Sequence, residues 1–175
     1  AGLDEVYDGN VIVDGEKYIS FKERTSIRYS KIAYMNQKDD LVLEMTVKEN
    51  IEWIKSLSNS SYDVNCFFEK FQLKDIENHY PHELSGGELS LICLLKNILL
   101  NRKYILLDEP NAKLDSQRKI YLNELLLSLS ENYSIIVVSH DMDFIDIADT
   151  IFHFEHKRVI ARKVDELLIN DNSFF

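Results

Sequence analysis

The chain has 175 residues, of which 45% are apolar, and its formal net charge is −10. A chain of this length and apolar content can bury one ordinary core, so we expect a single domain over residues 1–175. The acidic balance argues against a nucleic-acid partner, because nucleic-acid binders usually present a basic face. No apolar run has the length of a membrane-spanning helix, so we expect a cytoplasmic protein whose association with a membrane is peripheral.

The first part of the chain predicts short strands. Residues 17–20 and 32–35 have the composition of strands, and the second of these ends at Asn36 and Gln37. Gln37 therefore stands at the C-terminal end of a strand, although a lone glutamine is more often a solvated loop residue.

A helical region follows, and we predict that residues 46–83 form a small helical subdomain. Thr46 has the position of an N-cap, with Glu49 at capping-box spacing. The apolar residues of its first helix recur on one face: Val47, Ile51, Ile54 and Leu57. A second amphipathic helix from Val64 to Phe71 carries an aromatic stripe, which indicates core packing or the wall of a groove for a partner helix.

A long helix is predicted over residues 85–100, beginning at Ser85, Gly86 and Gly87. The free N–H groups at a helix start, together with glycines that allow close approach, can bind an anion. A bare Ser-Gly-Gly would more often be a cap without a ligand.

Two buried strands are predicted beyond this helix, at residues 104–107 and 134–138. Asp108 and Glu109 follow the first strand directly, and Pro110 comes next. His140 follows the second strand after Ser139, and an amphipathic helix over residues 115–130 joins the two. The carboxyl ends of parallel strands meet at one edge of a sheet, so these acids and the histidine are expected to lie together. Residues 150–155 and 158–163 predict a closing hairpin, and residues 165–175 a short helix with a frayed tail.

These motifs carry the resemblance to a known family. Residues 84–88, Leu-Ser-Gly-Gly-Glu, resemble the signature loop of ATP-binding cassette (ABC) ATPases, and residues 105–110 resemble their Walker B strand. Gln37, followed by Met-Thr-Val-Lys-Glu-Asn-Ile at residues 45–51, is similar to the Q-loop region of transporter cassettes. Residues 111–115 resemble the D-loop, although Lys113 stands where the family usually has a small residue. Residues 89–91 depart from the family's usual glutamine-glutamine-arginine.

The resemblance implies an α/β fold, a RecA-like P-loop NTPase parallel sheet with an inserted helical subdomain. Such proteins hold phosphates with a Walker A loop, G-x-x-x-x-G-K-[ST]. None of the five glycines of this sequence directly precedes a lysine, so the loop is absent from these residues. Residues 1–3, Ala-Gly-Leu, resemble the end of the helix that follows that loop. The expectation is an N-terminally truncated cassette.

The resemblance also implies the ligands ATP and Mg²⁺ and the roles of the site residues. Asp108 and Gln37 are expected at the metal. Glu109 is expected as general base, with His140 and Gln37 as further catalytic residues. The residues expected to bind the nucleotide held by a second subunit are Ser85, Gly86, Gly87, Glu88 and Asp115.

The implied function is that of the nucleotide-binding subunit of a bacterial ABC transporter, coupling ATP hydrolysis to transport. The implied partners are a second nucleotide-binding subunit, as homodimer or heterodimer, and the transporter's membrane subunit. Residues 46–51 and 80–84 look most like exporters of a peptide or lipid-like substrate. Without the Walker A loop we expect these 175 residues alone to be inactive.

Two alternatives remain open at this stage. The chain could be a half-site module that donates its signature loop to a partner's ATP and hydrolyses none itself. It could also be the C-terminal half of an SMC or Rad50-like ATPase head, although no heptads precede the signature and a Q-loop lies in the same piece.

Overall fold

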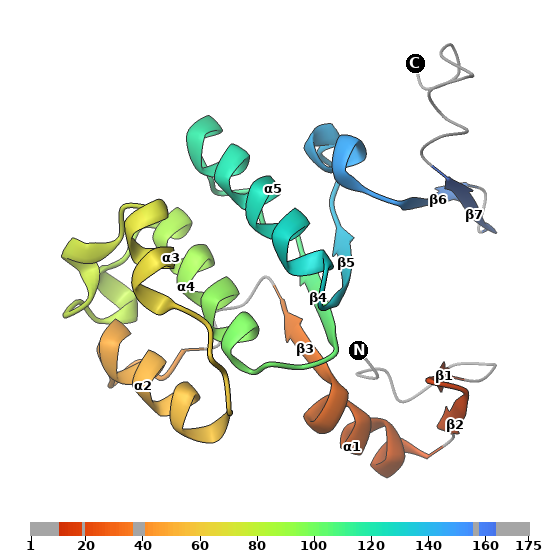
Figure 1. The fold of residues 1–175 in the computed structure, drawn as a ribbon, viewed down its shortest axis with the longest axis horizontal. Coiled ribbons are helices and arrows are strands. Elements are labelled where there is room, and N and C mark those ends of the chain that lie inside the picture. Colours follow the sequence, from red (N-terminus) through yellow and green to blue (C-terminus); the bar gives the residue numbers. More distant parts are fainter. Residues whose placement is uncertain (1–10, 19, 37–40, 156–157, 164–175) are drawn as a thin grey trace. The chain divides into compact units, whose positions relative to one another are not determined.

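The computed structural model describes residues 11–18, 20–36, 41–155 and 158–163, and it divides the chain into two compact units, residues 1–139 and 140–175. The first unit contains a parallel sheet and five helices among its described residues, and the second contains a short helical turn and a hairpin (Figure 1). The predicted domain boundaries stay predictions.

Three parallel strands form the sheet of the first unit. They are β3 (Ile32–Met35), β4 (Tyr104–Asp108) and β5 (Ser134–Val138), in the order β3-β4-β5. Met35 pairs with Leu107, which pairs with Val137, so all three strands end at the same edge. The prediction of a parallel sheet is confirmed.

The two faces of this sheet differ in burial. Ala33, Ile105 and Leu107 are each at most 1% exposed. On the other face Tyr104 and Leu106 are only partly buried, while Ile136 and Val138 are 54% and 60% exposed. The expectation that residues 104–107 are buried was therefore wrong for every second residue, since side chains alternate between the faces of a strand. The expectation that residues 134–138 are buried was wrong for the whole strand, whose residues are exposed or only partly buried.

Helices α4 (Gly86–Leu99) and α5 (Ser116–Ser130) contact the sheet at β3 and β5 respectively. In α4, eleven of 14 residues are buried, which explains why its sequence is apolar on nearly every side. Helix α4 also contacts α2 and so connects the sheet to the helical region. Cys93 of α4 is buried, whereas Cys66 is exposed.

The two helices predicted between residues 46 and 83 are present as α2 (Val47–Leu57) and α3 (Val64–Lys70). The Thr46 capping box is confirmed: the Glu49 N–H donates to Thr46 Oγ1 at 3.2 Å, and the Thr46 N–H donates to Glu49 Oε2 at 2.7 Å. Phe67, Phe68 and Phe71 are at most 3% exposed, so the aromatic stripe is core. Val47, Ile51 and Ile54 are buried, whereas Leu57 at the end of the helix is 60% exposed.

Helix α1 (Phe21–Lys31) was not predicted. Ser20 begins it with a capping box, in which the Glu23 N–H donates to Ser20 Oγ at 3.2 Å and the Ser20 N–H donates to Glu23 Oε2 at 2.9 Å. Because Ser20 is an N-cap, the strand expected over residues 17–20 is shorter than predicted. It is β2 (Glu16–Tyr18), which pairs antiparallel with β1 (Val11–Val13).

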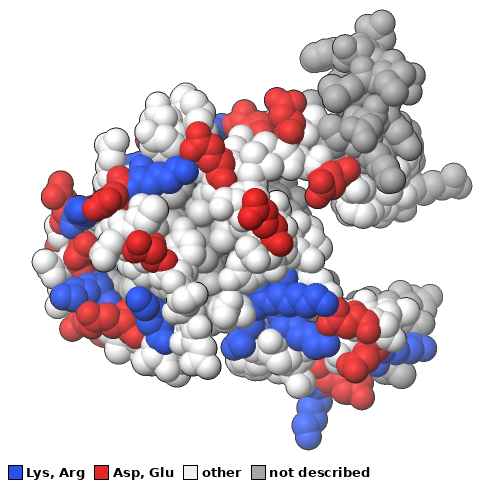
Figure 2. Space-filling view, viewed as in Figure 1, with Lys and Arg blue, Asp and Glu red and all other residues white. Residues whose placement is uncertain are grey.

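Asp14, in the turn between β1 and β2, ties this hairpin to the start of β4. Its carboxylate accepts hydrogen bonds from Lys31 Nζ at 2.8 Å, from the Tyr104 hydroxyl at 2.6 Å and from Lys103 Nζ. Figure 2 shows basic side chains gathered over the region of α1, beside acidic ones. The ammonium groups of Lys103 and Lys31 hold the pKa of Asp14 well below its usual range.

The second unit contains a 3₁₀ turn, Met142–Ile147, and the strands β6 (Thr150–Glu155) and β7 (Arg158–Lys163). The strands pair antiparallel, which confirms the predicted hairpin. Its turn at residues 156–157 and the helix predicted over 165–175 lie outside the described residues. None of the described helices is long and apolar enough to cross a membrane.

Candidate nucleotide-binding site

The paired acids stand at the C-terminal end of β4, as predicted. Asp108 is the last residue of the strand, in register with Val138. Glu109 turns the chain with a φ of 50°, a left-handed conformation that is unusual for a residue other than glycine. Its N–H donates to the Val138 carbonyl at 2.8 Å, which extends the contact with β5 one residue beyond the ladder.

Two further polar residues lie beside Glu109. Ser139 Oγ is 3.2 Å from Glu109 Oε2 and 3.4 Å from Asn111 Oδ1. Asn111 is 1% exposed. Neither residue was predicted to have a role of its own, although Asn111 begins the segment that resembles the D-loop and Ser139 directly precedes His140.

The start of α4 is fixed by a capping box. Ser85 Oγ accepts the Glu88 N–H at 3.3 Å and donates its own proton to Glu88 Oε2 at 2.7 Å, and the Ser85 N–H donates to Glu88 Oε2 at 2.8 Å. The hydrogen bonds from the Ser85 hydroxyl and N–H lower the pKa of Glu88. The capping box thus holds the Ser85 hydroxyl in a defined position at the helix start.

The two glycines of the signature loop lie against the loop that follows β4. A Cβ atom at Gly86 would lie 2.9 Å from Lys113 Cδ, and a Cβ atom at Gly87 would lie 2.8 Å from the Lys113 carbonyl oxygen. Ser90 Oγ donates to the Pro110 carbonyl at 3.4 Å. The first turns of the signature helix therefore pack against the loop that follows Asp108 and Glu109.

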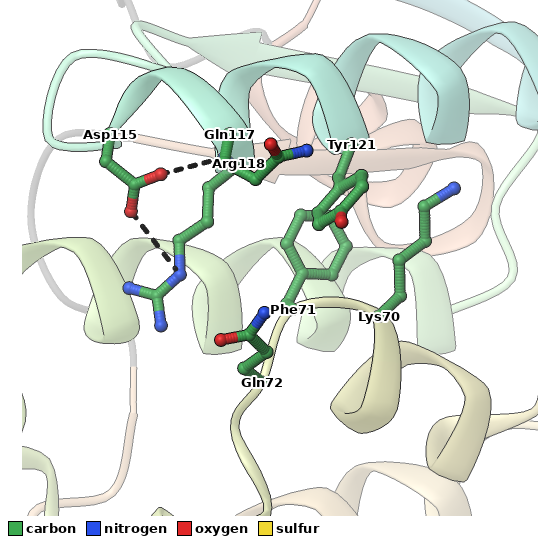
Figure 3. A pocket seen from close by; sticks show the side chains of 7 residues that line it. All are labelled: Lys70, Phe71, Gln72, Asp115, Gln117, Arg118 and Tyr121. Carbon is green, nitrogen blue, oxygen red and sulfur yellow. Dashed lines mark hydrogen bonds and ion pairs between the residues drawn. The ribbon is translucent and has the colours of Figure 1, made fainter.

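Asp115 begins α5, where its Oδ1 accepts the Arg118 N–H at 2.9 Å. Both residues line a pocket of about 240 Å³ between α3 and α5 (Figure 3). Asp115 Oδ2 also lies 3.7 Å from Arg118 Nε. The structure thus gives Asp115 a capping role, and its predicted contact with a nucleotide stays a prediction. The residues that line the pocket are Lys70, Phe71, Gln72, Asp115, Gln117, Arg118 and Tyr121.

Two predicted site residues are not placed in this region. Gln37 lies outside the described residues, although Asn36 before it follows the end of β3 at the same sheet edge as Asp108. His140 is the first residue of the second unit and follows Ser139 directly. Their catalytic roles stay predictions.

The residues present fit the metal-binding part of a Mg·ATP site, but not the part that wraps the β- and γ-phosphates. Within the described part of the chain, no three His, Cys, Asp or Glu side chains are gathered so as to hold a metal ion. Two adjacent carboxylates nevertheless suit Mg²⁺, which is commonly held by one or two carboxylates, waters and substrate phosphates. The glycine-and-lysine loop that wraps the β- and γ-phosphates is not among the 175 residues.

Comparison with known proteins decides the family. Residues 1–112 match the ABC transporter family. The chain belongs to the ABC transporter ATP-binding family. It has the ABC cassette fold, since it superposes on the dimeric ABC transporter cassette MJ0796 bound to ADP and Pi with a TM-score of 0.78 at 25% identity, over 93% of this chain and 76% of that one. CbiO1 from Clostridium perfringens has the same fold, with a TM-score of 0.73 at 20% identity over 96% and 71% of the two chains.

Two relatives of this ABC chain come from different transport systems. A lipoprotein-releasing system ATP-binding protein, LolD 2 of Chlorobaculum tepidum, is 32% identical over 164 residues, which cover 89% of this chain and 66% of the relative. The sulfate/thiosulfate import ATP-binding protein CysA of Mesostigma viride is 32% identical over 91% of this chain and 47% of the relative. The ABC chain thus spans 66% of the first relative and about half of the second.

Proposed function

We propose that this chain is part of the nucleotide-binding subunit of a bacterial ABC transporter and contributes to ATP hydrolysis coupled to transport. The observation that carries the proposal is the placement of Asp108 and Glu109 at the carboxyl end of a parallel strand, followed by a loop whose Lys113 lies against a capped Ser-Gly-Gly helix start. The relatives are transporter ATP-binding proteins, which favours this function over an SMC or Rad50-like head.

The role of each acid follows from its position. Bound at Asp108, Mg²⁺ would neutralise the charge that develops on transferred phosphate. The Glu109 carboxylate is the acceptor for a proton from the attacking water. Glu109 suits this role because the N–H contact to Val138 and the hydroxyl of Ser139 fix its backbone and side chain.

The signature loop would act on a nucleotide held by a second subunit. The N–H groups at the start of α4 and the positive end of its dipole favour phosphate oxygens. This proposal is supported by the dimeric relative, MJ0796. The partners are therefore a second ATP-binding subunit and a transporter membrane subunit, which would place the protein on the cytoplasmic face of the membrane.

For the direction of transport and the class of substrate, we propose export of a peptide or lipid-like molecule. The lipoprotein-releasing relative supports it, whereas the sulfate/thiosulfate import relative has the same 32% identity and supports the opposite direction. Isolation of the membrane subunit that copurifies with this chain tests the direction of transport, and copurification with an importer's membrane subunit would overturn the export proposal.

The half-site alternative is tested on the signature side, whose residues Ser85, Gly86 and Gly87 all belong to this chain. The deciding experiment mixes this chain with an ABC ATP-binding subunit chosen for an intact G-x-x-x-x-G-K-[ST] loop and inactivated in its own signature loop. The one composite site then combines the partner's phosphate loop with Ser85, Gly86 and Gly87 of this chain. We expect turnover of Mg·ATP from the mixture and none from either protein alone.

Two variants serve as matched controls for this experiment. Ser85→Arg places a bulky side chain at the signature loop and is expected to abolish turnover of the mixture. Glu109→Gln leaves the donated loop intact and is expected to spare it. Absence of turnover with the unaltered chain, or turnover that survives Ser85→Arg, would overturn the proposed signature function. Micromolar affinity of the chain alone for Mg·ATP would contradict the expected need for a second phosphate-binding loop.

A further inference from the structure

The pocket between α3 and α5 has an aromatic wall that the fold holds in place. The ring of Phe71, which is 1% exposed, meets the ring of Tyr121 edge to face, with 6.2 Å between the two ring centres. Lys70 Nζ lies 2.9 Å from Glu124 Oε2 and 5.7 Å from the centre of the Tyr121 ring. The end of α3 is thus held against α5 on one side of a space of about 240 Å³.

The other side of the pocket carries a guanidinium group. Arg118 Nε lies 3.7 Å from Asp115 Oδ2, an ion pair that is too long for a hydrogen bond, and the Arg118 side chain is 23% exposed. No hydrogen bond to either Nη group of Arg118 is seen in the part of the chain that the structure describes. Because Asp115 lies on the Nε side, the two Nη groups remain available as the planar fork that binds a carboxylate through two hydrogen bonds.

Gln72 adds an amide to the same side of the pocket, although its backbone is strained. Its φ of 55° is left-handed, a conformation that favours glycine over a residue with a side chain. No hydrogen bond of the Gln72 side chain is seen among the described residues, so none offsets the strain. In Figure 3 the side chains of Gln72 and Arg118 reach into the same space from opposite walls. Strained residues cluster at ligand-binding sites, where the side chain serves the ligand.

The size and the charges of the pocket indicate the class of ligand. Its volume of about 240 Å³ is below the range of about 300–1,000 Å³ that is typical for drug-sized ligands, so a molecule with one ring suits it. Of the two cations in the lining, Lys70 is paired with Glu124, which leaves Arg118 for an anion. A ring would pack on Tyr121. The Asp115 carboxylate repels a second anion, which keeps the expected affinity modest.

We propose that this pocket binds a small aromatic carboxylate, with the carboxylate at Arg118 and Gln72 and the ring against Tyr121. The bound molecule would join the end of α3 to the first turn of α5. Asp115, which begins that helix, comes two residues after Lys113 and thus directly beyond the loop that packs on the signature helix. The proposal requires neither a nucleotide nor a second subunit, so it is independent of the proposed function.

Binding is measured by NMR on the isotope-labelled 175-residue chain, with sodium benzoate as the probe and the ionic strength held constant. The readout is the movement of the backbone amide resonances of residues 70–72 and 115–121. We expect saturable movement, with a dissociation constant of about 1 mM or tighter. Benzamide has the ring without the charge and acetate the charge without the ring, so each should bind at least about tenfold more weakly.

Arg118→Gln and Arg28→Gln form a matched pair, because each removes one positive charge and Arg28, in α1, is not part of the pocket lining. Arg118→Gln should weaken benzoate binding at least about tenfold, and Arg28→Gln should leave it unchanged. Arg118→Lys keeps the charge and loses the planar fork, so it should bind benzoate at least about threefold more weakly than the unaltered chain. It replaces Arg118→Gln in the comparison if that variant does not fold.

Three outcomes would overturn the proposal. The first is the absence of saturable movement at residues 70–72 and 115–121, including movement that occurs only elsewhere in the chain. The second is equal affinity for benzamide and benzoate, which would show that the carboxylate is not recognised. The third is an equal loss of affinity in Arg118→Gln and Arg28→Gln, which would show attraction to the overall charge of the chain. Because neither ATP nor a second subunit is added, these outcomes leave the turnover experiment unaffected.

Discussion

The aliphatic stem of Lys113 lies across Gly86, so that a Cβ atom at Gly86 would stand 2.9 Å from Lys113 Cδ. The next glycine meets the same residue differently, because a Cβ atom at Gly87 would stand 2.8 Å from the Lys113 carbonyl oxygen. Both glycines are thus explained by contacts within the chain, in addition to any need for phosphate to approach the helix start.

The two glycines are expected to differ when replaced by alanine. Gly87→Ala should lower the free energy of unfolding by about 1–3 kcal/mol, because backbone at Lys113 has to move. Gly86→Ala should change it by less than about 1 kcal/mol, because the flexible Lys113 side chain can shift and alanine favours the helix more than glycine does. Urea denaturation followed by circular dichroism measures both values.

Lys113→Ala provides the control for this pair. It removes the Cδ atom that a new methyl group at residue 86 would meet but keeps the carbonyl oxygen that a methyl group at residue 87 would meet. In the K113A background, Gly86→Ala should therefore become neutral or stabilising, while Gly87→Ala stays destabilising. Equal losses for the two alanine variants would contradict the contacts seen at Lys113.

The sequence predicted the elements whose signals are local. The N-caps at Thr46 and Ser85 and the apolar run before Asp108 each point to one element, and the structure contains all three. Helix α1 was not predicted because its apolar residues form no continuous stripe along one face. Its Phe21 and Tyr29 are 48% and 70% exposed. The capping spacing of Ser20 and Glu23 was the one signal that could have revealed it.

Site residues could be predicted only where the order and spacing of residues in the sequence indicate a known motif. Asp108 and Glu109 follow from an apolar strand that ends in acids. The contact of Ser139 with Glu109 depends on the register of β4 and β5, and the contact of Lys113 with Gly86 on how α4 lies against the sheet. Neither the register nor the helix position leaves a periodic pattern in one sequence, since both arise from packing over long separations.

Asn50 is expected to be one of the most important polar side chains for stability. It is 2% exposed; its Nδ2 donates to the carbonyls of Val42, Met45 and Thr46, each at 3.0 Å, and its Oδ1 accepts the Val42 N–H at 2.8 Å. Asn50→Leu removes all four contacts and leaves partly buried backbone groups without partners. The free energy of unfolding should fall by about 3 kcal/mol, as measured by urea denaturation.

Asn97 offers a matched control for Asn50. It is 1% exposed and its Nδ2 donates to the Cys93 carbonyl at 2.8 Å, but its Oδ1 has no hydrogen-bond partner among the described residues. Asn97→Leu removes a buried acceptor that is already unsatisfied, so it should cost less than about 1 kcal/mol. A loss as large as that of Asn50→Leu would show that burial, and not the hydrogen bonds of Asn50, decides the result.

Asp14 should make the stability of the chain sensitive to acid. The ammonium groups of Lys103 and Lys31 and the Tyr104 hydroxyl lower the pKa of Asp14 from its ordinary value of 3.8. A carboxyl whose pKa is lower in the folded state stabilises the fold above its unfolded pKa, and this stabilisation is lost as pH falls below about 3.8 towards the folded pKa. Melting temperatures measured between pH 6 and pH 2.5 should fall less steeply for Asp14→Asn than for the unaltered chain.

Asp75 provides the reference for this comparison, since it lies in the 3₁₀ turn Lys74–Ile76 and no hydrogen bond or ion pair to its side chain is seen among the described residues. Asp75→Asn removes a carboxylate without removing a contact of this kind, so the effect of Asp14→Asn is compared with the effect of Asp75→Asn. An identical slope for Asp14→Asn and the unaltered chain would contradict a stabilising role for the contacts of Asp14 with Lys31 and Lys103.

Gln72 and Asn101 follow the ends of helices α3 and α4 in the same left-handed conformation, with φ values of 55° and 52°. Replacement by glycine should raise the free energy of unfolding only at Gln72. After α3, the Leu73 N–H donates to the Phe68 carbonyl at 2.9 Å and the Gln72 N–H to the Glu69 carbonyl at 3.2 Å, the pattern of a Schellman motif. Gln72→Gly should raise the free energy of unfolding by about 1 kcal/mol, because a side chain is strained in this conformation and glycine is not. Asn101→Gly should give no gain, because asparagine tolerates the conformation and its Oδ1 accepts the Tyr133 hydroxyl at 2.8 Å. Chemical denaturation measures the free energy of unfolding of the two variants. A loss of stability in Gln72→Gly would show that the contacts of the Gln72 side chain, at the pocket between α3 and α5, stabilise the fold by more than the strained backbone destabilises it.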